Sequence, residues 1–411
     1  THTGCRRTGC GEEANAMKKR PLVLVVCNAL DDKTRLERGI VSDSPAASRK
    51  VIMLCQALRE AGAHPCILSL GRGRANGSLT YFPRTVRRVS GIPVIYAPFS
   101  HVRFFSQFLS LFFLIGALFR LSSRRRRAVI FYNRMSAYLP LLLTASVTGY
   151  KRFLDLEDGE VAGQNSGPLK ARLGRLNTWL YDRLCPDGAL LACSALADMT
   201  AIRPVHCYYG STSRKALGEK PNTHPKSILM AGTLSTDTGA HLLIQAIRQL
   251  RREPGDWVRH LQFEVTGKGE AIDALQALAI EDTAPRVTVH GRTTDAQYAQ
   301  VLNRCSVGLA LKPVDGPLAN TTFPSKVIEF AEAGLLVLST DISDVRAVLG
   351  SGALYLTGNE PEELTGLFRK IVEQPEEMEA CAQRGQQAVV ARCAPHLAGQ
   401  AVFTFIFGDQ P

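Results

Sequence analysis

Acidic residues are scarce in the first half of this 411-residue chain. Residues 1–220 contain 33 lysines and arginines against 15 acidic residues, whereas residues 221–411 contain 16 against 22, so the two parts carry formal charges of +18 and −6. A basic half of this kind favours contact with nucleic acid, an anionic membrane surface or phosphorylated substrates, or it is simply a solvated surface. Zinc-finger, RRM and helix-turn-helix patterns are absent, which argues against nucleic acid.

The chain also lacks the cysteine spacings of a metal site or a disulfide framework. Its eleven cysteines are an odd number, they form no CxxC motif, and no two histidines have metal-ligand spacing. We therefore expect most cysteines to be small buried hydrophobic residues in a reducing compartment. A D-x-D motif beside a strand is absent as well, so no metal is expected.

No apolar run typical of a secretory signal peptide occurs at the N-terminus. Met17 is the first methionine, and we expect residues 1–16 to be a disordered extension. The most hydrophobic stretch, residues 104–121, is too often interrupted for the roughly 20 apolar residues of a spanning helix. The interruptions are Ser106, Gln107, Ser110 and Arg120. Three interpretations stay open: a crossover helix packed on a sheet, a helix that also enters a bilayer surface, and a true span.

A run of four arginines, 124–127, follows this stretch directly. Basic residues next to an apolar helix suit an anionic membrane surface. We expect a cytoplasmic protein that can be peripheral at the inner membrane.

Apolar strands alternate with helical patterns along most of the chain. This alternation predicts parallel sheets covered by helices, and therefore an α/β fold. The predicted strands of the first half are 21–27, 64–70, 91–98, 128–133, 151–156, 188–194 and 204–210. Those of the second half are 227–234, 261–269, 286–293, 307–313 and 335–340, followed by two terminal helices.

The break between the two series predicts the domain organisation. Residues 214–226 are dense in lysine, proline and polar residues and form the predicted linker. The linker separates an N-terminal Rossmann-like domain, 17–213, from a C-terminal one, 227–395, and 396–411 is a tail that can pack back on the first domain. In doubly wound domains ligands bind at the carboxyl ends of the strands, here across a cleft between the two sheets.

A candidate phosphate site lies where the loop ANTTFPS opens the helix KVIEFAEAG. Backbone N–H groups and the helix dipole at this point can hold phosphate. Lys326 in the first turn adds a positive charge, and Glu329 lies three residues later on nearly the same face. The alternative is an ordinary exposed ion pair.

The second half resembles the donor domain of retaining GT-B glycosyltransferases of group 1, the glycogen synthase-like type. The resemblance covers residues 226–395 and rests on MAGTLSTDTGAHLLIQAIRQL, FEVTGKGE, VTVHGRTTDAQYAQVLNRCSVGLALKP and FPSKVIEFAEAGLLVLSTDISDVRAVL. The form F-P-S-K-x-x-E is similar to that of capsule and exopolysaccharide enzymes. The resemblance implies a GT-B fold, retention at the anomeric carbon, a nucleotide-sugar donor linked to UDP or GDP, and no obligatory cofactor or metal. It also implies that Glu329 binds the donor ribose.

Three positions depart from the family pattern. Thr321 stands where the first glutamate of E-x7-E is expected, and Thr233 and Thr238 replace the arginine and lysine of the loop G-R-L-x-x-x-K-G. The chain is therefore either a variant that depends on Lys326, the helix dipole and hydroxyl donors, or a protein that has lost its donor chemistry.

The predicted donor-binding set gathers residues from four loops. Lys268 and Arg292 are candidates for the diphosphate or the base, and each could equally be a surface charge. The whole set is Gly232, Thr233, Thr238, Gly267, Lys268, Arg292, Thr321, Thr322, Phe323, Pro324, Ser325, Lys326 and Glu329.

On the acceptor side, the loop after the first strand is loosely similar to the family's glycine-rich turn, with Gly39, Ser42 and Ser44 as candidates. The acidic loop LDLEDGE stands where the family often has a histidine. Glu157 and Asp158 are the candidates for accepting a proton from, or orienting, the acceptor hydroxyl. Lys326, through its positive charge at the donor phosphate, is the third catalytic candidate. A solvated acidic turn is the alternative.

These residues predict a hexosyltransferase that moves a sugar from a nucleotide sugar to a glycan or lipid-linked acceptor in polysaccharide or glycoconjugate synthesis. Two alternatives stay open. One is a sugar-nucleotide epimerase, which shares the architecture. The other is a non-catalytic carbohydrate- or membrane-binding scaffold.

Overall fold

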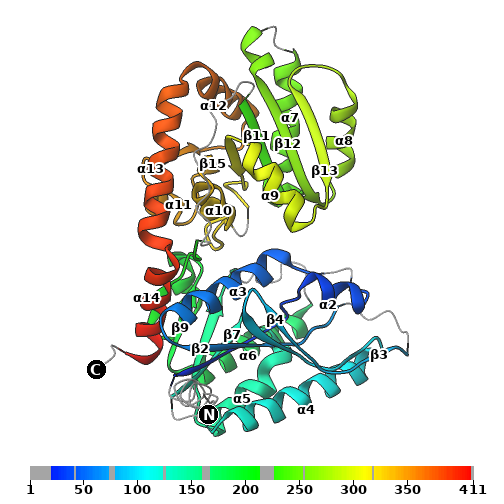
Figure 1. Cartoon of the computed structure of the whole chain (residues 1–411), viewed down its shortest axis with the longest axis vertical. Helices are drawn as coiled ribbons and strands as arrows, with labels where there is room; N and C mark the ends of the chain where they lie inside the picture. Colours follow the sequence, from blue (N-terminus) through cyan, green and yellow to red (C-terminus); the bar gives the residue numbers. More distant parts are fainter. Residues whose placement is uncertain are drawn as a thin grey trace, which may run out of the picture. The chain divides into compact units, whose positions relative to one another are not determined.

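The computed structural model describes residues 20–40, 43–73, 79–123, 126–159, 167–212, 226–252, 255–316 and 319–408. Ser42, the predicted extension 1–16 and the predicted linker up to residue 225 lie outside these ranges. The chain divides into two compact units (Figure 1). Unit 1 is Thr1–Ala192, Leu196–Ser211 and Pro395–Pro411, and unit 2 is Cys193–Ala195 and Thr212–Ala394.

Unit 1 is built on an eight-stranded sheet in the order β10-β9-β8-β7-β1-β2-β5-β4. All neighbouring strands are parallel except β4 and β5, which form an antiparallel pair. The strands are β1 Leu22–Cys27, β2 His64–Ser69, β4 Thr85–Val89, β5 Ile92–Tyr96, β7 Arg127–Tyr132, β8 Lys151–Leu156, β9 Gly188–Leu191 and β10 Val205–Cys207. The central strand β1 is buried along its whole length, as expected for a sheet covered on both faces.

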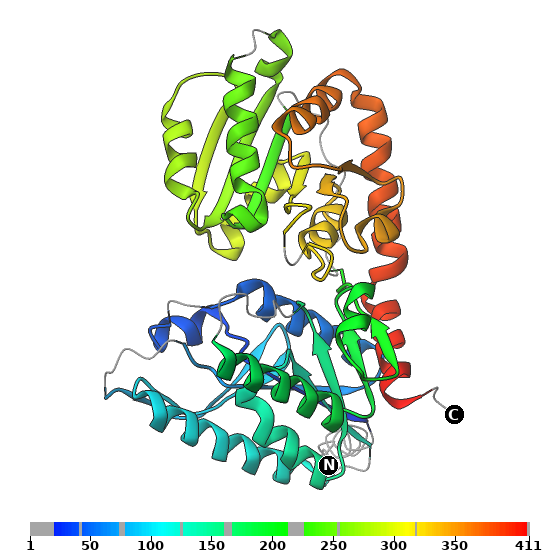
Figure 2. The same cartoon turned by 180° about the vertical axis from the view of Figure 1, so that it is seen from behind.

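The helices of unit 1 lie on both faces of this sheet (Figure 2). They are α2 Asp32–Glu37, α3 Pro45–Glu60, α4 Arg103–Leu121, α5 Leu139–Val147, α6 Pro168–Leu184 and α14 Pro395–Phe407, and a two-stranded ribbon joins β3 Tyr81–Phe82 to β6 Phe99–Ser100. The α4 helix packs against β6 and α5, so the stretch predicted at 104–121 is a crossover helix of this unit.

Sequence reasoning missed β4 and the β3–β6 ribbon. Short polar strands such as TVRRV alternate weakly, and β4 is an edge strand whose side chains are all half-buried or exposed. It is paired through a tight turn in which Ser90 and Gly91 both have positive φ.

The last helix of the chain, α14, packs on α3. Gly399 permits this contact, because a Cβ there would lie 2.0 Å from the carbonyl oxygen of Ala57. Val402, Phe403 and Ile406 of α14 join the core of unit 1.

The contact between α14 and β10 is expected to be sensitive to pH. His206 stacks on Phe405 with ring centroids 5.5 Å apart, and burial lowers the pKa of His206 from its usual 6.5. As pH falls below 6.5 through the lower folded-state pKa, the unfolded chain binds a proton that the folded chain resists, so stability is lost. Between about pH 7.5 and about pH 5.5 we expect the urea midpoint to drop more for the natural chain than for His206→Phe. Parallel decreases would contradict this.

Unit 2 contains a six-stranded, wholly parallel sheet in the order β13-β12-β11-β14-β15-β16. Its strands are β11 Lys226–Thr233, β12 Leu261–Lys268, β13 Arg286–Gly291, β14 Val307–Ala310, β15 Leu336–Thr340 and β16 Ala353–Leu356. Its helices are α7 Ala240–Arg252, α8 Ile272–Ile280, α9 Asp295–Arg304, α10 Lys326–Glu332, α11 Val345–Leu349, α12 Pro361–Glu373 and α13 Pro375–Cys393.

Sequence reasoning missed α8, α11 and β16, and it expected two terminal helices where the structure has α12, α13 and α14. The α8 segment follows a glycine-rich loop and buries only Leu275 and Leu278, so its helical pattern is weak.

The prediction that most cysteines are buried is confirmed within the described residues: of the nine cysteines there, all but Cys207 are buried.

One helical stretch of the described residues, Pro375–Phe407, is long and apolar enough to cross a membrane, although 44% of its most apolar part is buried within the protein. It comprises α13 and α14, whose buried faces belong to the cores already described. Core helices of soluble proteins share this property, so this finding is weak evidence for a span.

Candidate functional site

The strand order of unit 2 places its binding site between two particular strands. From β11 the chain moves outward through β12 to β13, and then returns to the other side of β11 through β14, β15 and β16. Such a reversal leaves a crevice at the carboxyl ends of the two central strands, which is where doubly wound sheets bind ligands. In unit 2 this point lies beyond Gly232 of β11 and Ala310 of β14.

Two glycines bring the backbone of the β11 and β12 ends into close contact. A Cβ on Gly267 would lie 1.8 Å from the carbonyl oxygen of Gly232, and φ of Gly267 is +136°. A Cβ on Gly232 would have Lys326 Cε as its nearest neighbour, at 3.9 Å. The side chain of Lys326 therefore reaches across the end of β11, and φ of +115° at Gly232 favours glycine at this position.

The loop after β11 is held together by its own side chains. The hydroxyl of Thr238 donates to the carbonyl oxygen of Thr233 at 2.7 Å and accepts from the backbone N–H of Ser235 at 3.0 Å. Glu270, which follows β12, accepts from the backbone N–H and the hydroxyl of Thr236, each at 3.1 Å. These hydrogen bonds lower the pKa of Glu270. Thr238 thus shapes the loop, whereas Thr233 is exposed at its start.

The first turn of α10 carries the polar pair at the heart of the candidate site. Lys326 Nζ lies 2.6 Å from a carboxylate oxygen of Glu329, and both side chains are about three-quarters buried, with 25% and 22% exposed. Lys326 also donates to the hydroxyl of Tyr298 at 2.9 Å and lies over its ring, 4.6 Å from the centroid. Tyr298 is in the first turn of α9, and sequence reasoning missed it because a lone tyrosine on a helix carries no motif.

A second lysine stands at the end of β14. Lys312 Nζ donates to the hydroxyl of Thr322 at 3.3 Å, and its backbone N–H donates to Thr340. The hydroxyl of Thr321 is buried and has no hydrogen-bond partner among the described residues. Lys312 could have been found from the sequence, since it lies near the carboxyl end of the predicted strand 307–313, at the ligand-binding edge. The loop that precedes α10 therefore brings one lysine and one unpaired hydroxyl to this crevice.

The remaining donor-side candidates surround this crevice. Phe323 and Pro324 are buried beneath the start of α10, whereas Ser325, its first flanking residue, is exposed. Lys268 and Arg292 are exposed where β12 and β13 end. These placements put every donor-side candidate at the carboxyl edge of the unit 2 sheet.

Unit 1 has its own reversal of strand order, between β1 and β7, and a cluster of charged side chains at the same edge. Asp155, at the end of β8, is fully buried and lies 3.0 Å from Lys50 Nζ of α3, while its second carboxylate oxygen has no hydrogen-bond partner among the described residues. Glu157 also pairs with Lys50, and its backbone N–H donates to Asn133 at 2.8 Å. Sequence reasoning selected Glu157 and missed the other three residues.

The other acceptor-side candidates that the structure describes make no side-chain hydrogen bond or ion pair with Lys50, Asp155 or Glu157. Asp158 is exposed. Gly39 follows the short helix α2 with φ of +60°, and Ser44 caps α3 by accepting from the backbone N–H of Ala47 at 3.4 Å. The loop after β1 is thus partly helical, and Ser44 has a structural role in it.

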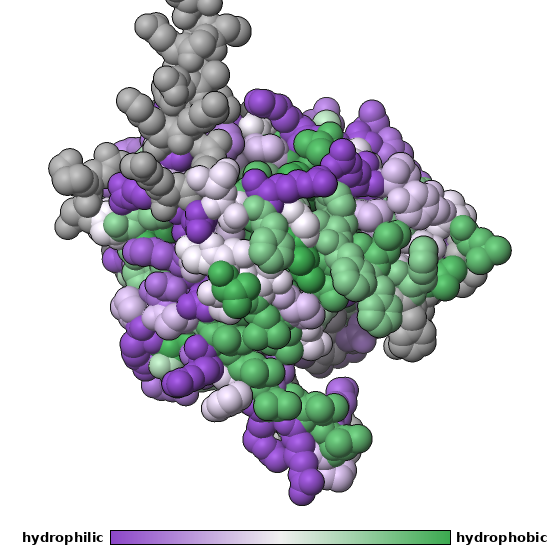
Figure 3. Space-filling model, turned by 90° about the horizontal axis from the view of Figure 1, so that it is seen from below, coloured by the Kyte–Doolittle hydropathy of each residue, from purple (hydrophilic) through white to green (hydrophobic). Residues whose placement is uncertain are grey.

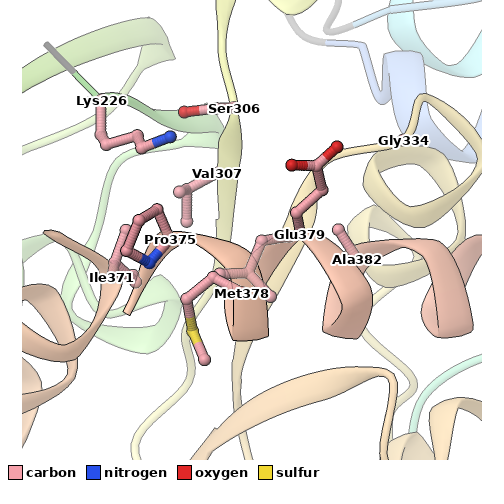
Figure 4. A pocket seen from close by; sticks show the side chains of 10 residues that line it. Lys226, Ser306, Val307, Gly334, Ile371, Pro375, Met378, Glu379 and Ala382 are labelled. Atoms are coloured by element: carbon pink, nitrogen blue, oxygen red, sulfur yellow. The ribbon is translucent and has the colours of Figure 1, made fainter. Parts of the chain in front are cut away.

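A small cavity in unit 2 lies at the opposite, amino-terminal edge of the sheet. Its volume is about 60 Å³, and Lys226, Ser306 and Glu379 are its polar lining residues (Figure 4). Burial lowers the pKa of Lys226. This volume equals that of about two water molecules, so the cavity cannot hold a nucleotide. Clusters of three or more potential metal ligands are absent from the described ranges.

Comparison with known proteins identifies the fold. Residues 225–374 match the family described as glycosyl transferases group 1, and no curated protein matches the chain. Among solved structures, HepE from Anabaena in complex with UDP has a TM-score of 0.64 at 12% identity, covering 93% of this chain and 98% of that one. Sucrose-phosphate synthase from Thermosynechococcus elongatus has a TM-score of 0.64 at 13% identity, covering 93% and 97%.

A glycosyltransferase from Rickettsia africae is similar to the same degree, with a TM-score of 0.64 at 12% identity over 95% of this chain and 100% of that one. Each likeness extends over both units. The family match covers the unit 2 sheet and the loop that carries Lys326. The chain therefore has the two-domain, Rossmann-like fold of GT-B glycosyltransferases, and residues 225–374 of its second unit match the group 1 glycosyltransferase family.

Proposed function

We propose that the protein transfers a hexose from a UDP- or GDP-linked donor to a glycan or lipid-linked acceptor, with retention at the anomeric carbon. The observation that carries the proposal is the Lys326–Glu329–Tyr298 group beside Gly232, at the point where the strand order of unit 2 reverses. HepE binds UDP in its structure, and this chain shares its fold.

Lys326 would stabilise the departing nucleotide. When the bond between the sugar C1 and the phosphate oxygen breaks, the electron pair stays on the diphosphate, where negative charge grows. Cations fixed in place before the reaction stabilise that charge most effectively. Tyr298 and Glu329 hold the ammonium of Lys326 in place. Lys312, at the neighbouring strand end, would be a second cation, because Thr233 and Thr238 stand where the family loop has an arginine and a lysine.

Glu329 would bind the donor ribose through its carboxylate. One of its oxygens already accepts from Lys326, and a carboxylate can accept several further hydrogen bonds from hydroxyl groups. The hydroxyl of Thr321, in the loop that leads into α10, is buried and unpaired among the described residues, and we propose that it becomes available to the donor when this loop adjusts around it.

The acceptor would bind at unit 1. A carboxylate there would accept the proton that the acceptor hydroxyl loses on attack, or would orient the acceptor sugar. Glu157 and Asp158 were selected from the sequence, and the structure adds Asp155, which is buried with one unpaired oxygen. Because Glu157 and Asp155 both pair with Lys50, we propose that the ammonium of Lys50 balances the negative charge of these two carboxylates. We also propose that the protein is a cytoplasmic enzyme of polysaccharide or glycoconjugate synthesis.

Donor binding can be tested by measuring thermal unfolding of the full chain with UDP, GDP, UDP-glucose and GDP-mannose. A ligand present at about 100 times its Kd stabilises the folded state by about 2.7 kcal/mol, which raises the melting temperature by several degrees. We expect one nucleotide series to do so. Chromatography of the donor after incubation without acceptor is the companion measurement, because an epimerase alone would convert the free donor. No response to any nucleotide would favour the non-catalytic scaffold.

A further inference from the structure

Helix α4 exposes a stripe of large apolar side chains on its outer face. The side chains of Phe105, Phe108, Phe112 and Phe119 are 58%, 61%, 69% and 54% exposed. These positions recur at three- and four-residue intervals and form one stripe along the helix. A surface helix of a soluble protein normally turns this stripe inward.

The opposite side of α4 faces the protein with polar residues as well as apolar ones. Ser106 and Ser110 are buried with Leu114 and Leu118. The hydroxyl of Ser110 donates to the carbonyl oxygen of Pro98 at 2.7 Å, and that of Ser106 accepts from the backbone N–H of Ser100 at 3.3 Å. The orientation of α4 is therefore fixed by specific hydrogen bonds, and the phenylalanines are left outside.

Two neighbouring helices extend the apolar stripe. Contacts join α4 to α5 and α5 to α6, so the three helices lie side by side. We call this surface the α4–α6 face. Seen from that side, the molecule shows a broad apolar area with hydrophilic residues at its borders (Figure 3). Besides the four phenylalanines, its exposed apolar residues are Leu143, Val147, Leu169, Leu173, Leu176 and Trp179.

Basic residues accompany the apolar ones on α6. Lys170, Arg172, Arg175 and Arg183 are all exposed. The chain contains no aspartate or glutamate between Glu60 and Asp155, so α4 and α5 bring no acidic residue to the face. Apolar aromatic residues next to lysine and arginine are typical of helices that lie in a membrane interface.

Further positive charge lies at the end of α4. Arg120, in the last turn of α4, is exposed, and so is Arg126, which donates to the carbonyl oxygen of Phe407 at 3.2 Å. Arg127 is less exposed: it donates to the carbonyl oxygen of Thr148 at 2.6 Å and lies over the ring of Tyr150. Arg124 and Arg125 lie outside the described residues. The exposed positive charge described at this face is therefore greatest on α6, with a further contribution from the end of α4.

We infer that the α4–α6 face binds the surface of an anionic lipid bilayer. A second copy of the chain is a poorer occupant, because a twofold contact would bring the basic residues of α6 near their own copies. An anionic bilayer instead complements both the apolar area and the positive charge. The 19-residue α4 is about 28 Å long and would lie flat in the interface, buried on its inner side.

The inference rests on the proposed function only for the acceptor, since a lipid-linked acceptor would lie in the same membrane. Lipid binding itself can be measured without any sugar donor. A protein that binds vesicles but no nucleotide would contradict the proposed function alone, and one that binds nucleotide but no vesicles would contradict this inference alone.

The test is cosedimentation of the full chain with vesicles of phosphatidylglycerol and phosphatidylcholine, and with vesicles of phosphatidylcholine alone. We expect binding to the anionic vesicles, at least tenfold weaker for Phe108→Ser/Phe112→Ser. We expect Arg172→Glu/Arg175→Glu to weaken binding by at least about 25-fold, since each basic residue near the surface contributes a factor of about five and the two glutamates add repulsion from the anionic lipid.

The controls replace an exposed apolar residue with serine, and two exposed arginines with glutamate, on unit 2. Ile280 is 84% exposed, and the side chains of Arg259 and Arg286 are 77% and 80% exposed. We expect Ile280→Ser and Arg259→Glu/Arg286→Glu to bind vesicles like the natural chain. Equal losses in the controls, no binding to anionic vesicles, or a dimer in analytical ultracentrifugation that only the phenylalanine variant dissociates would overturn the inference.

Discussion

Replacing Lys326 with methionine is expected to lower kcat/KM for sugar transfer by about 100- to 1000-fold, the usual cost of removing one preorganised donor from a developing negative charge. Methionine keeps the length and packing of the lysine stem beside Gly232 while removing the ammonium. Stability should change by about 1 kcal/mol or less, because the pair with Glu329 is partly exposed. Initial rates and melting temperatures measure the two effects separately.

The matched control for Lys326 is Lys370→Met, on α12 of the same unit. Lys370 also pairs with a glutamate, Glu377, at 2.9 Å, but its side chain is 37% exposed and it is not one of the candidate site residues. We expect its activity to equal that of the natural chain. Tyr298→Phe should have an intermediate effect, because it removes one hydrogen bond that positions Lys326 and leaves the ring in place. Full activity in Lys326→Met would show that Lys326 does not stabilise the leaving diphosphate, and would contradict the proposed donor site.

Gly267→Ala is expected to destabilise the protein by about 2 to 5 kcal/mol, through backbone strain and overpacking together. The new Cβ would overlap the carbonyl oxygen of Gly232, and φ of +136° is unsuitable for alanine. Neither atom can move without separating β11 from β12, which pair through Gly232 and Gly267 to Thr233 and Lys268. Urea unfolding of both proteins measures the difference.

Gly291→Ala is the control for the conformational part of this effect. Gly291 ends the next strand, β13, and has φ of +63°, but a Cβ there would meet nothing within 4 Å. We expect a cost of only about 1 to 2 kcal/mol, from the left-handed backbone alone. If both variants lost the same stability, the close approach of the two strand ends would have no separate energetic role.

The sequence predicted the alternating elements of both units well because buried parallel strands are nearly continuous apolar runs. Val23 to Cys27 and Val337 to Leu338 illustrate this. Elements with little buried surface were missed, among them β4 and α8. Their side chains gain little from folding, so selection leaves only a weak pattern in the sequence.

The candidate site was predictable where residues are adjacent in the chain and not where folding brings them together. Lys326 and Glu329 share one helical turn, so their pairing followed from spacing. Tyr298 and Lys50 reach the two polar groups from separate helices, 28 residues before Lys326 and 105 before Asp155, and no local pattern records such contacts. Thr238 was selected by its position in a motif, yet its hydroxyl hydrogen-bonds within its own loop.

The packing of α14 on α3 has a consequence for biosynthesis. The surface of α3 that receives Gly399 is made early, whereas α14, the helix that covers it, is made only after the whole of unit 2. Val25 and Leu54 belong to the same cluster as Phe403, so the nascent first unit cannot complete its core until unit 2 and α14 have been synthesised. A stop codon shortly before Pro395 would thus damage the part of the protein that is synthesised first.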